Sequence, residues 1–253
     1  MPAPEQVTEA FELLRQGRDA EARALLEKVV HDDYADAAVL ETLGDVREKL
    51  GDKTGALDAY LGAVTHLRAR GELQRALGVL ELMLIVDEHN LDARCEAAAI
   101  REERGDGAGA WRELAAAAVA ATHEADAAVV ARVEHAVLGT ETPVPGAEAA
   151  LAIIDALAPR DAAAAARIAR ALAGSLMARR LTDEAHAVEG RATALESARA
   201  AASDGRSPLS RLLEEREDAV PKTDPDAGSF ADDTAEHQRE DKSGDDDSTD
   251  IER

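Results

Sequence analysis

A repeated glycine interval constrains the fold of this chain more than any other feature. Four glycines are each followed five residues later by an alanine, in the pairs Gly17/Ala22, Gly51/Ala56, Gly71/Ala76 and Gly105/Ala110. The step from the first glycine to the second equals the step from the third to the fourth. Glycine adopts the left-handed conformation that ends many helices without strain from a Cβ. An alanine lets two helices approach closely. The interval therefore predicts helix hairpins with a period of about 34 residues.

The period weakens toward the C-terminal half. A further step of one period from Gly105 reaches Gly139, where the alanine is missing, and the same step from Gly146 reaches Arg180, which is followed by Ala185. We expect degraded hairpins in this part of the chain.

Composition favours helices throughout. Apolar residues make up 45% of the chain and aromatic residues only 2%. The apolar residues are mostly alanine and leucine, which favour helices, whereas sheets draw on aromatic and β-branched residues. The fold class is therefore predicted to be all-α, with about eleven helices. Their expected positions are residues 4–16, 19–31, 36–50, 53–70, 72–86, 91–104, 107–122, 125–138, 147–158, 160–180 and 182–201.

Two of these helices carry more specific expectations. Gly51 and Gly71 are closer together than one period, so the helix between them is predicted to be the second helix of one hairpin and the first of the next. The segment 79–86 is apolar almost all round and is predicted to be the most buried helix.

The segment 37–70 carries the clearest single repeat. Its large, small and aromatic positions are Leu40, Leu43, Gly44, Gly51, Ala56, Tyr60 and Ala63. In this order the residues resemble the tetratricopeptide repeat (TPR). The resemblance implies a right-handed superhelical solenoid of helix hairpins. We expect a TPR-like array over 1–140 and a degraded helical extension over 141–205. Residues 206–253 are expected to form an acidic, mostly disordered tail.

The charge of the chain bears on its partners. The formal net charge is −23, and residues 206–253 contribute 16 acids and 7 bases to it. Such a field repels nucleic acid and anionic membranes and favours basic partners. There is neither a signal-peptide pattern at the N-terminus nor an apolar run of about 18 residues. We therefore expect a cytoplasmic protein with no membrane contact.

No catalytic, cofactor-binding or metal-binding constellation is predicted. The seven histidines are scattered, without an HExxH motif. The glycines of 104–109 lack the Gly-Lys-Ser/Thr ending of a phosphate-binding loop. Cys95 is expected to be a half-exposed structural thiol, and Trp111 is expected to pack between hairpins.

The TPR resemblance implies that first helices of hairpins line a concave groove. The residues assigned to it are Glu41, Asp45, Glu48, Cys95, Ala99 and Glu102. An acidic groove would suit a protein or peptide rich in lysine and arginine. The predicted function is a non-catalytic interaction scaffold or adaptor. Its alternatives are a secretion- or assembly-type chaperone and a regulatory subunit of a larger complex. The alanine-rich segment at 162–166 and the degraded repeats around it are expected either to pack loosely or to form a homodimer through the alanine-rich face.

Overall fold

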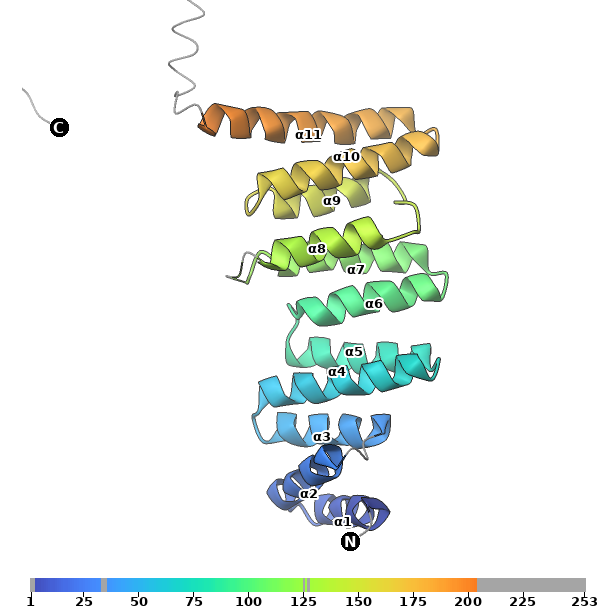
Figure 1. Ribbon diagram of the computed structural model, residues 1–253, viewed down its shortest axis with the longest axis vertical. Helices are drawn as coiled ribbons and strands as arrows, with labels where there is room; N and C mark the ends of the chain where they lie inside the picture. Colours follow the sequence, from blue (N-terminus) through green and yellow to red (C-terminus); the bar gives the residue numbers. More distant parts are fainter. Residues whose placement is uncertain (1–2, 33–35, 125, 127, 204–253) are drawn as a thin grey trace, which may run out of the picture. The chain divides into compact units, whose positions relative to one another are not determined.

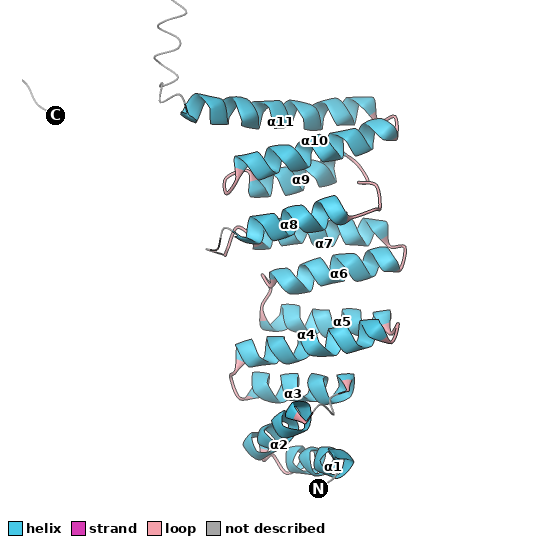
Figure 2. Ribbon diagram, viewed as in Figure 1, coloured by secondary structure: helices cyan, strands magenta, loops and turns pink. Residues whose placement is uncertain are grey.

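The computed structural model describes residues 3–32, 36–124, 126 and 128–203. These residues form eleven helices and no strand, which confirms the all-α prediction (Figure 2). The described residues belong to one compact unit, Met1–Ser207. None of the described helices is long and apolar enough to cross a membrane. The predicted tail at 206–253 lies outside the described residues.

The helices follow one another as a stack along the sequence (Figure 1). They are α1 (Ala3–Arg15), α2 (Asp19–His31), α3 (Ala37–Lys49), α4 (Lys53–Ala69), α5 (Leu73–Val86), α6 (Leu91–Glu103), α7 (Gly107–Ala120), α8 (Ala128–Gly139), α9 (Ala147–Leu157), α10 (Ala162–Ala178) and α11 (Thr182–Ser203). Their number and order match the prediction, and their ends differ from it by a few residues.

The hairpin turns have the conformation that the glycines predict. The glycines with positive φ are Gly17, Gly51, Gly71 and Gly105. In two of these turns an aspartate then caps the next helix, because Asp52 accepts a hydrogen bond from the Gly55 N–H and Asp106 accepts one from the Gly109 N–H.

The alanines that follow these glycines lie in the interior of the array. Ala22, Ala56 and Ala76 are 0% exposed, and Ala110 is 1% exposed. The sequence predicts a structural role for these alanines, at positions where two helices approach closely, and their burial agrees with that role. Ala22, Ala76 and Ala110 therefore belong to the packing between helices.

The C-terminal turns lack the left-handed glycine of the earlier hairpins. Gly139 is the last residue of α8, and Gly146 precedes α9 in an extended conformation with a φ of −177°. Neither is therefore the left-handed residue of a hairpin turn. Arg180 takes that role between α10 and α11, with a φ of 63°. An arginine thus stands where the earlier hairpins have glycine.

Helix α4 packs against both α3 and α5, as its predicted membership in two hairpins requires. Within the first of these hairpins, the buried ring of Tyr60 lies against the backbone of Gly44. A side chain at position 44 would collide with this ring. The two residues therefore act together to set how closely α3 approaches α4.

Alternate helices also contact each other, so the stack has two rows. Contacts join α7 to α9 and α9 to α11, and others join α6 to α8 and α8 to α10. Ion pairs extend both rows toward the N-terminus, from Arg75 on α5 to Glu41 on α3 and from Arg68 on α4 to Glu96 on α6. We call α3, α5, α7, α9 and α11 the odd row, and α4, α6, α8 and α10 the even row.

The burial prediction for 79–86 is wrong, and the alanine-rich face has a different role from the one expected. The segment 79–86 is not enclosed, because Leu82 is 38% exposed and Ile85 is 75% exposed. Apolarity all round a helix does not ensure burial where no neighbour covers one face. The alanine-rich face is not free for a dimer, because Ala164, Ala165 and Ala166 are buried in a cluster that runs from Leu91 to Leu195.

Candidate protein-binding surface

The six residues predicted to line one groove lie in different rows of the stack. Glu41, Asp45 and Glu48 are on α3, in the odd row. Cys95, Ala99 and Glu102 are on α6, in the even row. The structure therefore separates them into two sets. The reason is that α4 belongs to two hairpins, α3–α4 and α4–α5. The next hairpin is therefore α6–α7, and its first helix lies in the even row, whereas α3 lies in the odd row.

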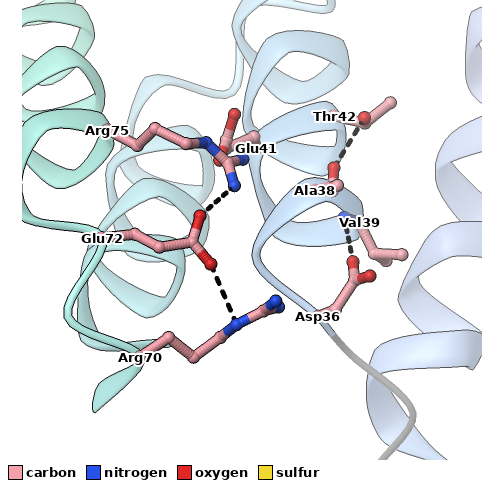
Figure 3. Close-up of polar contacts among 8 residues, drawn as sticks. All are labelled: Asp36, Ala38, Val39, Glu41, Thr42, Arg70, Glu72 and Arg75. Atoms are coloured by element: carbon pink, nitrogen blue, oxygen red, sulfur yellow. Dashed lines mark hydrogen bonds and ion pairs between the residues drawn. The ribbon is translucent and has the colours of Figure 1, made fainter. Parts of the chain in front are cut away.

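Glu41 is held within the array by charge pairing. The guanidinium of Arg75 lies 2.9 Å from the Glu41 carboxylate and 2.5 Å from Glu72 (Figure 3). Glu72 is also paired with Arg70, whose Nε lies 2.9 Å from Oε1. In this network the two carboxylates are balanced by two guanidinium groups. Glu41 therefore serves mainly to join α3 to α5.

Asp45 and Glu48 are placed differently from Glu41. Both side chains are exposed, and neither has a cationic partner among the residues that the structure describes. The hydroxyl of Tyr60 donates to Asp45 at 2.7 Å and lies 3.5 Å from Glu48. Burial of the tyrosine, followed by its bond to Asp45, raises the pKa of Tyr60 well above its usual range. The hydroxyl thus stays protonated and positions two carboxylates whose charge is not neutralised.

Glu102 has a structural partner outside α6. Its carboxylate accepts a hydrogen bond of 2.6 Å from the backbone N–H of Thr142. The carbonyl of Thr142 accepts a second hydrogen bond from the indole of buried Trp111, at 3.1 Å. Together the two bonds fix the connection between α8 and α9. Trp111 therefore packs between hairpins, as the sequence predicts.

Cys95 and Ala99 are half-buried on α6. Burial, and to a lesser extent the charge of Glu96, raises the pKa of the Cys95 thiol to about 11. A protonated, half-buried thiol is a weak nucleophile. The even-row set therefore offers less accessible charge than Asp45 and Glu48 on α3.

The exposed face of α5 was missed by the sequence prediction. Leu82 and Ile85 lie on it, and Gly78 on the same helix is also exposed. The sequence signal for this face is the apolar run at 79–86, which on its own predicts burial. An apolar face without intramolecular cover is equally consistent with such a run.

A pair of histidines was also missed. The rings of His89 and His123 are stacked with their centroids 3.9 Å apart and an interplanar angle of 10°. They are separated by one repeat period in the sequence, so the period was the signal that could have found them. Among the described residues there is no group of three or more histidines, cysteines or carboxylates that could hold a metal ion.

A cavity of about 410 Å³ lies between α7 and α9. Its walls are Trp111 and four alanines, and Arg112 and Glu148 also line it. Cavities of this size with mostly apolar walls can accept a side chain or a small ligand. It lies in the odd row, as do Asp45 and Glu48.

The repeat period reappears in contacts between helices of the same row. Glu41 and Arg75 are paired across 34 residues, Glu134 and Arg167 across 33, and Asp155 and Arg191 across 36. Residues about one repeat period apart therefore meet in space at these three places in the described part of the array. The array is TPR-like. Its C-terminal hairpins keep this TPR-like spacing even though they lack the glycine and alanine pattern.

No protein-family model and no curated protein matches this chain. Several solved structures are similar to it. MamA from Desulfovibrio magneticus RS-1, solved from residue 41 to its end, is 20% identical with a TM-score of 0.28, and the match covers 78% of this chain and 96% of the matched chain. Cut9 with Hcn1, described as an APC/C hetero-tetramer, is 15% identical with a TM-score of 0.29, over 85% of this chain and 42% of the matched chain. A tetratricopeptide repeat protein from Parabacteroides merdae is 14% identical with a TM-score of 0.24, over 76% and 93%. At these values the likeness assigns no function to this chain.

Proposed function

We propose that this TPR-like array is a non-catalytic scaffold that binds a positively charged segment of a protein partner. The observation that carries the proposal is the exposure of the Asp45 and Glu48 carboxylates without a described cationic partner. Both carboxylates are exposed on α3, and their only described polar partner is the neutral hydroxyl of Tyr60. A lysine or arginine from another protein can supply the missing positive charge.

The intramolecular ion pairs also favour a positively charged partner. Arg68, Arg75 and Arg167 are each engaged by carboxylates of neighbouring helices. Arg75, which pairs with Glu41 of α3 and with Glu72, is thus already engaged within the array. With a formal net charge of −23, the chain attracts basic proteins and repels nucleic acid and anionic lipid. The proposal accordingly includes a cytoplasmic protein partner and no membrane or nucleic-acid ligand.

Affinity capture with charge-reversed variants tests this proposal. The full chain is immobilised and exposed to a lysate of the source cells, beside the double variant Asp45→Lys/Glu48→Lys. The control is Asp58→Lys/Glu124→Lys, which makes the same change in net charge at two other acids without a described cationic partner. Circular dichroism verifies that all three chains keep their helices.

The expected result is one or more basic proteins held by the wild type and by the control, and lost from the α3 variant. Moderate salt should weaken this capture. At physiological ionic strength the Debye length is about 8 Å, and the attraction between exposed charges farther apart than this is largely screened. Equal capture by all three chains would show that Asp45 and Glu48 do not form the binding surface. Capture of no protein by any chain would refute the scaffold proposal.

A further inference from the structure

One ion pair joins α3 directly to α5. Because α3 and α4 form one hairpin and α4 and α5 form the next, α3 and α5 run in the same direction. Arg75 lies 2.9 Å from Glu41, so these two residues are level with each other. From this pair and the shared direction, we expect residues at equal distances beyond it to lie at similar heights on the two helices. Asp45 and Glu48, four and seven residues after Glu41, are thus expected on the side of α3 that faces the part of α5 after Arg75.

That part of α5 presents a single stripe of residues. Gly78, Leu82 and Ile85 follow Arg75 by three, seven and ten residues, and this spacing places them on the same helix face, with exposed Glu81 along its edge. All three are exposed. The stripe therefore begins at the Glu41–Arg75 pair and continues as a strip of apolar surface beside the two α3 carboxylates.

Gly78 leaves a gap in the stripe. A Cβ built on this residue meets no heavy atom within 4 Å, so no other part of the described chain fills the space above it. Its φ is outside the left-handed region, and the helix does not require a glycine there. The gap leaves room for the aliphatic stem of a long side chain.

The apolar part of the stripe is unusually open for its residue types. Ile85 is 75% exposed, and Leu82 is 38% exposed one turn before it. Val119, which occupies the position one repeat period after Ile85 on α7, is 49% exposed. Isolated exposed aliphatic residues are common, but a stripe bordered by charged groups is typical of interaction surfaces.

We propose that the surface formed by Asp45 and Glu48 of α3 and by Gly78, Leu82 and Ile85 of α5 binds a basic amphipathic helix of a partner protein. The inference rests on the proposed scaffold function and specifies its partner. Aliphatic residues of the partner helix cover Leu82 and Ile85. A lysine or arginine stem lies over Gly78, and its charged end pairs with Asp45 or Glu48. Acidic helices and anionic lipid surfaces are repelled by the same carboxylates.

The proposal is tested with a labelled synthetic amphipathic helix made of leucine and lysine. Its binding to the full chain is measured by fluorescence anisotropy at physiological salt. Three variants remove one element of the surface each: Asp45→Lys reverses the charge, Gly78→Leu fills the gap, and Ile85→Ser removes the apolar contact. The second and third alter exposed positions, so neither disturbs the core. Gly174→Leu is the matched control for the filled gap, because Gly174 on α10 is equally open and lies in the even row.

We expect the affinity for the peptide to fall about tenfold or more in each of the three surface variants. Gly174→Leu and Asp58→Lys/Glu124→Lys are expected to leave it within about twofold. No binding to the wild type, or equal losses in surface and control variants, would overturn the inference. If the peptide is insensitive to Gly78→Leu and Ile85→Ser while the α3 double variant still loses its cellular partner, the scaffold function stands and only the amphipathic-helix surface is refuted.

Discussion

The backbone of Gly44 on α3 faces the ring of Tyr60 on α4 so closely that a Cβ on the glycine would lie 2.6 Å from Cδ1. The tyrosine ring is fully buried, and its hydroxyl emerges beside Asp45. The absence of a side chain at position 44 thus sets where the hydroxyl reaches the carboxylates of α3. A residue needed for packing is in this way connected to the surface proposed to bind a partner.

Gly44→Ala should destabilise the array. The new methyl group and the Tyr60 ring cannot both keep their places, and such overpacking costs about 1–3 kcal/mol. Unfolding in urea, followed by circular dichroism, measures this change. Gly78→Ala is the matched control, because a methyl group there meets open space. It should stabilise α5 by about 0.5–1 kcal/mol, since alanine loses less backbone entropy than glycine in a helix. Equal effects of the two substitutions would contradict the packing assigned to Gly44.

Arg180→Gly should stabilise the turn between α10 and α11. Arg180 has a φ of 63°, a conformation that costs a residue with a Cβ about 1–2 kcal/mol. Part of the gain is lost to the greater freedom of glycine in the unfolded chain, so the net increase is expected to be about 0.5–1 kcal/mol. Differential scanning calorimetry should show a higher Tm. Arg179→Gly should lower it, because the neighbouring guanidinium donates to the carbonyls of Val144 and Pro145.

Cys95 should react slowly with iodoacetamide in the folded chain. Burial raises its thiol pKa to about 11 from the value of 9.0 expected for a free thiol, so the fraction of reactive thiolate near pH 8 falls about a hundredfold. The protonated thiol is favoured by folding. Its contribution to stability is therefore present below pH 9 and is lost as the pH rises toward 11. Mass spectrometry of alkylation between pH 7 and pH 10, with urea-unfolded chain as reference, checks this. Equal rates in the two states would show that the thiol is accessible.

Trp111→Phe should loosen the connection between α8 and α9. Phenylalanine keeps most of the buried surface but removes the N–H that donates to Thr142, and a lost hydrogen bond of this kind costs about 1 kcal/mol. Hydrogen exchange at the Thr142 amide should become faster, although Glu102 still accepts from it. Glu102→Ala should speed the same exchange further. If neither substitution changes exchange at Thr142, the two bonds do not hold this segment.

Much of the fold could be predicted from the sequence because its turns depend on local chemistry. Glycine at 17, 51, 71 and 105 meets a backbone requirement that few other residues satisfy, and its spacing gives the hairpin length. The turn at Arg180 could be anticipated only from the period, because the local signal is absent there. The exposed face of α5 could not be predicted, since hydrophobicity does not reveal which neighbours a helix will have.

The candidate surface was predicted less well for a similar reason. Charge and helix periodicity correctly place Glu41, Asp45 and Glu48 on one helix, but they say nothing about their partners. Arg75, which pairs with Glu41, lies one full repeat period away, so the pairing depends on the register of two helices that are not adjacent in sequence. Whether these three residues share a surface with Cys95 and Glu102 depends on the row in which each helix lies. Only the three-dimensional arrangement supplies that information.

The double membership of α4 changes what an insertion into this array would do. A duplicated hairpin adds two helices and leaves every later helix on its original side of the stack. A duplicated single helix moves all later helices to the opposite side. The short spacing between Gly51 and Gly71 corresponds to the insertion of a single helix. For this reason the surface from α3 to α5 combines the first helix of one hairpin with the second helix of another. A chain lengthened or shortened by whole hairpins beyond α5 would keep that surface, whereas a change of one helix between α3 and α5 would abolish it.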